Sequence, residues 1–144
     1  PEAPDKRKKN APSANRILKP QDEAATGHLI DAADLEEDAS GAKPRAWTRA
    51  LTVPPGSFAA NTTYELTIDW ESKGLRGKAD FFANFICDGP GGRKKQLATW
   101  KGDVGKTGTL TKELATDGSE KWTLAVGVRG SGHLIVKRIR IKRK

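Results

Sequence analysis

Two stretches of strict alternation between apolar and polar residues constrain the fold more than any other feature of this sequence. Residues 63–70 (TYELTIDW) and 121–128 (KWTLAVGV) both have the period of two that is typical of a half-buried β-strand. The alternating apolar residues are Tyr64, Leu66, Ile68 and Trp70 in the first stretch and Trp122, Leu124, Val126 and Val128 in the second. An amphipathic helix would show a period of about 3.6 instead, so the sequence predicts an all-β fold.

Further segments have the same character, and each is bounded by Gly, Pro, Asp or Asn. They are residues 47–53, 79–88, 95–100, 108–114 and 133–141. This spacing of short strands predicts a two-sheet antiparallel β-sandwich. The alternation slips near Lys137 and Arg138, which predicts a β-bulge in the last strand. Only residues 31–38 (DAADLEED) are expected to form a helical turn, at an exposed acidic corner.

The length of 144 residues is that of about one domain, and the net charge is +8. We predict that residues 1–14 form a flexible basic N-terminal segment, because they lack any apolar period, and that residues 15–144 form the sandwich. Positive charge gathers at both ends of the chain, at residues 6–9 and 137–144. Such ends attract polyanions, although solubility alone would also account for them.

The sequence contains no constellation of residues that predicts catalysis or a cofactor. Cys87 is the lone cysteine, and beside it His28 and His133 cannot complete a zinc site of standard ligand spacing. No run of about 18 apolar residues could span a membrane. The chain begins at Pro1 and contains no methionine, which is compatible with removal of a signal peptide or excision from a longer protein. We therefore expect a protein that is not an enzyme and has no cofactor.

The four tryptophans are the sharpest candidates for ligand contacts, because aromatic faces stack on sugar rings or bases. Trp47, Trp70 and Trp122 each share a strand phase with apolar residues, so we expect them in the core. Trp100 shares its phase with Gln96 and a small residue instead. Trp100 is therefore the best candidate for an exposed platform, and the alternative is a partly buried edge residue.

One phase of the neighbouring strand at residues 79–88 carries polar groups and is expected to line a groove. It consists of Phe82, Asn84, Ile86 and Asp88. Amides at such positions can hydrogen-bond to hydroxyl groups of a ligand. The predicted ligand-binding residues are Trp100, Asn84, Gln96, Phe82 and Asp88.

Three segments together resemble a known family. They are 28–47 (HLIDAADLEEDASGAKPRAW), 53–70 (VPPGSFAANTTYELTIDW) and 119–141 (SEKWTLAVGVRGSGHLIVKRIRI), and they are similar to the jelly-roll carbohydrate-binding modules of the galactose-binding-like type. The resemblance implies a jelly-roll sandwich that binds a glycan without catalysis. It also implies a monomeric module that is extracellular or secreted, as an accessory domain of a polysaccharide-processing protein.

Members of that family often hold a structural calcium between a corner glutamate, here Glu36, and an aspartate of the final strand. This sequence has Lys137 and Arg138 in that strand instead. We therefore expect no metal, and a salt bridge from Glu36 to one of these bases in its place.

The ligand is expected to be an acidic or neutral polysaccharide, and the basic ends of the chain favour an acidic one. Two alternatives remain open. One is a virion jelly-roll coat protein whose basic arm neutralises packaged nucleic acid. The other is a structural or adhesive β-sandwich domain without a small ligand.

Overall fold

The computed structural model of the protein describes residues 15–21, 26–39, 41–43, 46–74, 79–89, 91–100, 106–118 and 121–144. Strands make up nearly all of the secondary structure of these residues. They are β1 (Arg16–Ile17), β2 (Ile30–Asp38), β3 (Trp47–Val53), β4 (Thr63–Lys73), β5 (Asp80–Gly89), β6 (Gly92–Trp100), β7 (Lys106–Ala115), β8 (Trp122–Arg129) and β9 (His133–Arg143). Each of the strands expected from the alternation is present, with bounds that differ by a few residues.

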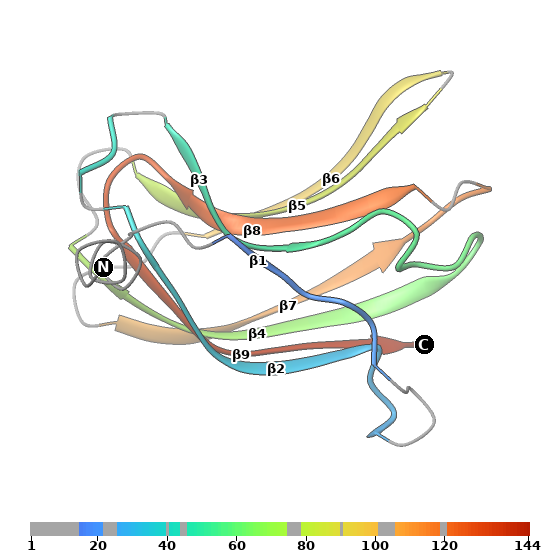
Figure 1. Cartoon of the computed structure of the whole chain (residues 1–144), viewed down its shortest axis with the longest axis horizontal. Coiled ribbons are helices and arrows are strands. Elements are labelled where there is room, and N and C mark those ends of the chain that lie inside the picture. The colour runs from blue at the N-terminus through green and yellow to red at the C-terminus, as the bar shows by residue number, and fades with distance from the viewer. Residues whose placement is uncertain are drawn as a thin grey trace, which may run out of the picture.

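The strands form two stacked sheets, which appear as two layers in Figure 1. Sheet A has the strand order β1-β3-β8-β5-β6, and sheet B has the order β2-β9-β4-β7. Neighbouring strands are antiparallel except for the short β1, which pairs with β3 in parallel. This architecture confirms the predicted two-sheet jelly-roll sandwich.

The hydrophobic core fills the space between the sheets, because each long strand turns one side of its alternation inward. The fully buried large side chains include Tyr64, Leu66 and Ile68 of β4, Phe81 and Phe85 of β5, Leu124 of β8 and Ile139 of β9. Trp70 and Trp122 belong to the same cluster, as predicted. Trp122 stacks on Phe85 with 4.7 Å between ring centroids, which fixes both rings in the core.

The acidic segment 31–38 is part of strand β2 and not a helical turn, which corrects the prediction. Its side chains alternate around one irregularity: Leu35 and Glu37 are buried, while Asp34 has a φ of 61°. Asp34 lies opposite Lys137, the position at which β9 bulges against β4. The extra residue of the bulge interrupts the period of two in β9. In β2 the positive φ of Asp34 interrupts the period at the matching position. The predicted bulge in the last strand is confirmed.

The last two strands of the chain, β8 and β9, lie in different sheets, and each is an inner strand of its sheet. Strand β8 lies between β3 and β5 in sheet A, and β9 lies between β2 and β4 in sheet B. Figure 1 shows β8, in orange, in one layer and β9, in red, in the other. The C-terminal part of the segment that resembles the family therefore supplies one inner strand to each sheet.

The predicted N-terminal segment 1–14 lies outside the described residues, so its flexibility stays a prediction. The described structure begins at Asn15, whose side-chain oxygen accepts a hydrogen bond of 2.8 Å from the Thr52 hydroxyl. Within the described ranges, no helix has the length and apolar character needed to cross a membrane.

Candidate functional site

The outer face of sheet A, which points away from sheet B, gathers aromatic, polar and basic side chains. The ladder pairings place on it Trp47 and Arg49 of β3, Thr123, Ala125 and Arg129 of β8, Phe82, Asn84, Ile86 and Asp88 of β5, and Arg93, Lys95 and Leu97 of β6. Sheet A is curved, and the β5–β6 hairpin and the start of β3 both rise away from sheet B (Figure 1). We call this set of side chains the outer face.

Trp47 lies at the surface, which corrects the prediction that it is a core residue. Its side chain is 47% exposed. The prediction extended the alternation of Leu51 and Val53 back to Trp47, but β3 has a register shift between Arg49 and Leu51. The extra residue moves Trp47 and Arg49 to the outer face.

Gly127 of β8 allows the irregular part of β3 to come close. A Cβ atom at this glycine would lie 2.0 Å from the carbonyl oxygen of Thr48 and 2.8 Å from the Cα of Arg49. No side chain can be accommodated at such distances, so the local path of β3 requires glycine at this position. The exposure of Trp47 therefore depends on a residue of the neighbouring strand.

The Trp47 ring is held in place by contacts to three other strands of sheet A. It meets the buried ring of Phe82 edge to face, with centroids 4.7 Å apart. The guanidinium of Arg129 lies 5.4 Å and the ammonium of Lys95 lies 5.7 Å from its centroid. Arg129 is in turn ion-paired with the buried carboxylate of Asp80. A ring fixed in this way can stack on a ligand without first losing much conformational freedom.

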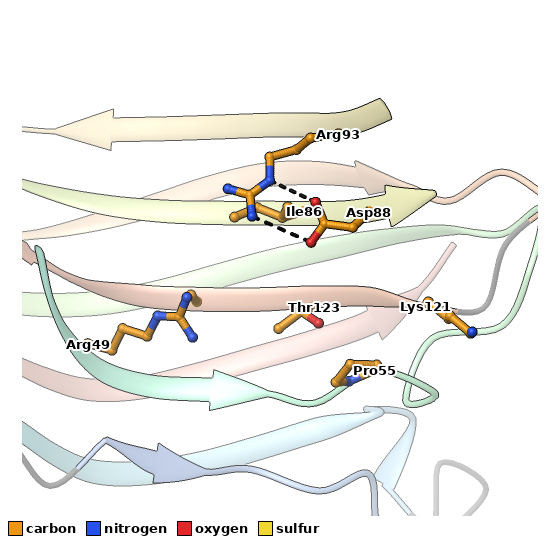
Figure 2. Close-up of a pocket in the computed structure, with 8 residues that line it drawn as sticks. Arg49, Pro55, Ile86, Asp88, Arg93, Lys121 and Thr123 are labelled. Atoms are coloured by element: carbon orange, nitrogen blue, oxygen red, sulfur yellow. Dashed lines mark hydrogen bonds and ion pairs between the residues drawn. The ribbon is translucent and has the colours of Figure 1, made fainter. Parts of the chain in front are cut away.

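A pocket of about 330 Å³ opens on the same face. It is lined by Arg49, Pro55, Ile86, Asp88, Arg93, Lys121, Thr123 and Ala125. Figure 2 shows Arg49 and Lys121 at opposite ends of the pocket with Thr123 between them. Arg93 donates from Nε to Oδ1 of Asp88 at 2.8 Å, and this hydrogen bond raises the pKa of the guanidinium.

Asn84 contributes a buried polar atom to this face. The residue is 7% exposed, and its Oδ1 accepts no hydrogen bond from any of the described residues. It lies opposite Ala125, which lines the pocket, and opposite Leu97, which is 40% exposed. An unsatisfied buried acceptor costs about 1–3 kcal/mol, so a hydrogen-bond donor at this position would be stabilising.

The structure brings together three of the predicted ligand-binding residues and separates one from them. Phe82, Asn84 and Asp88 share the outer face, as their common phase predicted. Gln96 instead donates from Nε2 to the carbonyl oxygen of Ala115 at 2.6 Å, a bond that links β6 to β7 of the other sheet. The side chain of Trp100 lies outside the described structure, and only its backbone pairing with β5 is known.

Sequence reasoning missed Trp47, Arg49 and Lys95 as members of the site. The alternation within β3 alone could not reveal them, because the bulge changes the face that each residue occupies. The one available signal was Gly127, since a glycine inside a strand often marks a bulge or a close approach of backbones.

The ion pairs of β2 and β9 differ from the one that was expected for Glu36. Glu36 contacts His133, with 2.8 Å between Oε1 and Nε2, and not Lys137 or Arg138. Arg138 donates from Nε and Nη2 to the two carboxylate oxygens of Asp31, both at 2.8 Å, and this lowers the pKa of Asp31. In the described part of the chain, no group of three or more His, Cys, Asp or Glu residues could hold a metal ion.

Comparison by sequence finds no relatives: no protein-family model matches the chain, and no curated protein matches it. Similarity is found only among solved structures, at the level of the fold.

The xylan-binding domain CBM22-1 of Paenibacillus barcinonensis Xyn10C is similar with a TM-score of 0.58 and 13% identity, over 76% of this chain and 71% of that domain. The CBM22-1–GH10 modules of Clostridium thermocellum xylanase 10B, complexed with xylohexaose, give a TM-score of 0.51 and 14% identity over 64% of this chain. The match spans 19% of the length of that xylanase chain. The C-terminal domain of EclA, a sugar-binding protein, gives 0.50 and 18% identity, over 77% of this chain and 79% of that one. The resemblance to jelly-roll carbohydrate-binding modules is therefore confirmed as one of fold.

Proposed function

We propose that this protein is a non-catalytic carbohydrate-binding module and that its glycan lies on the outer face of sheet A. The observation that carries the proposal is the half-exposed Trp47, which packs on Phe82 two residues before Arg49 of a pocket lined by both polar and apolar side chains. Aromatic rings in such positions stack on the apolar faces of sugar rings. Asn84 adds a buried acceptor that a sugar hydroxyl could satisfy.

The fold supports the same proposal. The xylan-binding domain and the sugar-binding domain described above share this sandwich. Export and an accessory role beside a polysaccharide-processing enzyme are parts of the proposal that come from the resemblance alone. They can be examined separately from binding.

The test is a glycan array followed by titration of the selected glycan with the parent protein and Trp47→Ala. If Trp47 stacks on the sugar, the substitution removes roughly 1–3 kcal/mol of binding free energy, by analogy with the stacking of bases. The melting temperature should change little, because the ring is half exposed. Trp47→Phe keeps a ring and should retain part of the affinity.

Ile17→Ala is the matched control, since Ile17 is a large apolar residue that is 54% exposed and does not line the pocket. It should bind as the parent does. Unchanged affinity of Trp47→Ala for every glycan that the parent binds would remove the outer face as the binding site.

A further inference from the structure

Basic side chains outnumber acidic ones on the outer face. The cations on the face and at the rim of its pocket are Arg49, Arg93, Lys95, Lys121 and Arg129, and the carboxylates are Asp80 and Asp88. Both carboxylates are already engaged, Asp80 by Arg129 and Asp88 by Arg93. The face therefore has positive charge that its own carboxylates do not neutralise.

Arg49 and Lys95 carry this surplus at the two places where a ligand would make contact. Both side chains are exposed, and neither forms an ion pair within the described structure. Lys95 lies over the Trp47 ring, and Arg49 lines the pocket. Arg49 also follows Trp47 by two residues on the same side of β3, about 7 Å along the strand.

The position of Lys95 discriminates between ligands. A neutral sugar that stacks on Trp47 competes with the Lys95 ammonium for the Trp47 ring. Such a sugar can interact with the displaced ammonium only through its hydroxyl groups. A sugar with a carboxylate or sulfate instead gives the ammonium an anion, and hydrogen bonds between charged partners are stronger than those between neutral ones. The arrangement of ring and cation thus favours an anionic ligand.

We propose that the ligand of the outer face is an anionic glycan, a chain that bears carboxylate or sulfate groups, and this inference rests on the proposed function. The sugar stacked on Trp47 presents its anionic group to Lys95. The next sugar of the chain presents its own group to Arg49 at the pocket. The planar guanidinium of Arg49 suits either anion, because it can donate two parallel hydrogen bonds to carboxylate or sulfate oxygens.

The experiment uses pairs of glycans that differ in charge and share a backbone. One pair is oligogalacturonate and the same oligomer with its carboxylates methyl-esterified, and the other is dextran sulfate and dextran. Binding of the full chain is measured at two salt concentrations for the parent, for Arg49→Gln/Lys95→Gln and for Lys73→Gln/Lys142→Gln. The last variant loses the same formal charge at two exposed lysines of sheet B.

The parent should bind the charged member of at least one pair about tenfold or more tightly than the neutral member. Arg49→Gln/Lys95→Gln should abolish that preference, and Lys73→Gln/Lys142→Gln should keep it. The pair that responds distinguishes a carboxylated ligand from a sulfated one.

Three results would overturn the inference. Equal loss in both double variants would mean that overall charge, and not this face, attracts the chain. The parent could also bind the charged and neutral members of each pair equally well, with both affinities weakened by Trp47→Ala. That result would refute the anionic ligand and leave the proposed function intact. Failure to bind any glycan of these pairs or of the array would refute both.

Discussion

Gly127 shapes the outer face without contributing a side chain to it. The backbone of β3 crosses so close to this glycine that a methyl group would overlap the carbonyl oxygen of Thr48. The irregular stretch of β3 places Trp47 outside the core, where it rests on Phe82. The platform for a ligand therefore depends on the absence of a side chain in the adjacent strand.

Gly127→Ala should destabilise the protein and disturb the platform together. Forcing one extra methyl group into a packed position costs about 1–3 kcal/mol of unfolding free energy. Urea denaturation measures this loss, and the tryptophan fluorescence of the folded state reports the change around Trp47.

The control is Gly89→Ala, because a Cβ at Gly89 would meet no atom within 4 Å. Its unfolding free energy should lie within about 0.5 kcal/mol of the parent value. If both variants were equally stable, β3 would not need the close approach that is described here.

Trp100 and Gln96 were both predicted to bind the ligand, and we now expect different effects from substituting each of them. Gln96 bonds to the backbone of Ala115, so Gln96→Ala should weaken the link between β6 and β7 more than it weakens glycan binding. Whether Trp100 is a second platform stays a prediction. Trp100→Ala should then keep the melting temperature and lose affinity, which the titration used for Trp47→Ala would measure.

At the scale of elements, β2 is fastened to β9 by side chains as well as by backbone pairing. The Asp31–Arg138 pair joins the two strands with two hydrogen bonds on the outer surface of sheet B. His28 of the loop before β2 and Arg140 of β9 lie near the same carboxylate and also lower the pKa of Asp31.

Asp31→Asn should lower stability at neutral pH and have no such effect in acid. Because the folded-state pKa of Asp31 is lowered, its charged form stabilises the fold above the unfolded-state pKa of about 3.9. That contribution is lost as the pH falls through the folded-state value. Urea denaturation of parent and variant at about pH 7 and about pH 2.5 measures the difference.

Asp34→Asn in the same strand is the control, since asparagine tolerates the positive φ of that position and Asp34 makes no ion pair in the described structure. Its unfolding curve should match the parent's at both pH values. A pH-independent loss in Asp31→Asn would assign the effect to packing instead of charge.

The strands were predictable wherever apolar and polar residues alternate regularly along the sequence. Strands β4 and β8 show this clearly, because Tyr64 to Trp70 and Trp122 to Val128 face the same core without interruption. Strand β2 was missed because the irregular backbone at Asp34, with its positive φ, interrupts the alternation. The site was only partly predictable for the same reason. The residues of β5 alternate regularly, so the face that each of them occupies could be predicted. The face that Trp47 occupies depends instead on how β3 pairs with β8, and the sequence of β3 alone does not reveal this pairing.

At the scale of the whole molecule, residues 1–14 should be dispensable for folding and important for contact with polyanions. Deleting them removes Lys6, Arg7, Lys8 and Lys9 but leaves β1 and its pairing with β3 in place. Circular dichroism should show an unchanged β spectrum, and gel retardation by a polyanion should be weaker.

Loss of the folded spectrum on deletion would show that the domain boundary is wrong. The same preparations examine the coat-protein alternative. A coat protein should assemble and copurify with nucleic acid through this segment, while a glycan-binding module should remain monomeric.

The order in which the sandwich can be completed follows from the positions of its last two strands, β8 and β9. When the ribosome has released the chain only as far as β7, sheet A lacks β8 and sheet B lacks β9, so β2 has no neighbour and β3 is separated from β5. Each layer closes only after β8 and then β9 have left the exit tunnel, and β9 must pair with a strand made about a hundred residues earlier. Until that moment the inner apolar surfaces of the two sheets are not fully covered, and pairing between strands so distant in sequence should make folding slower than in a protein built from local contacts.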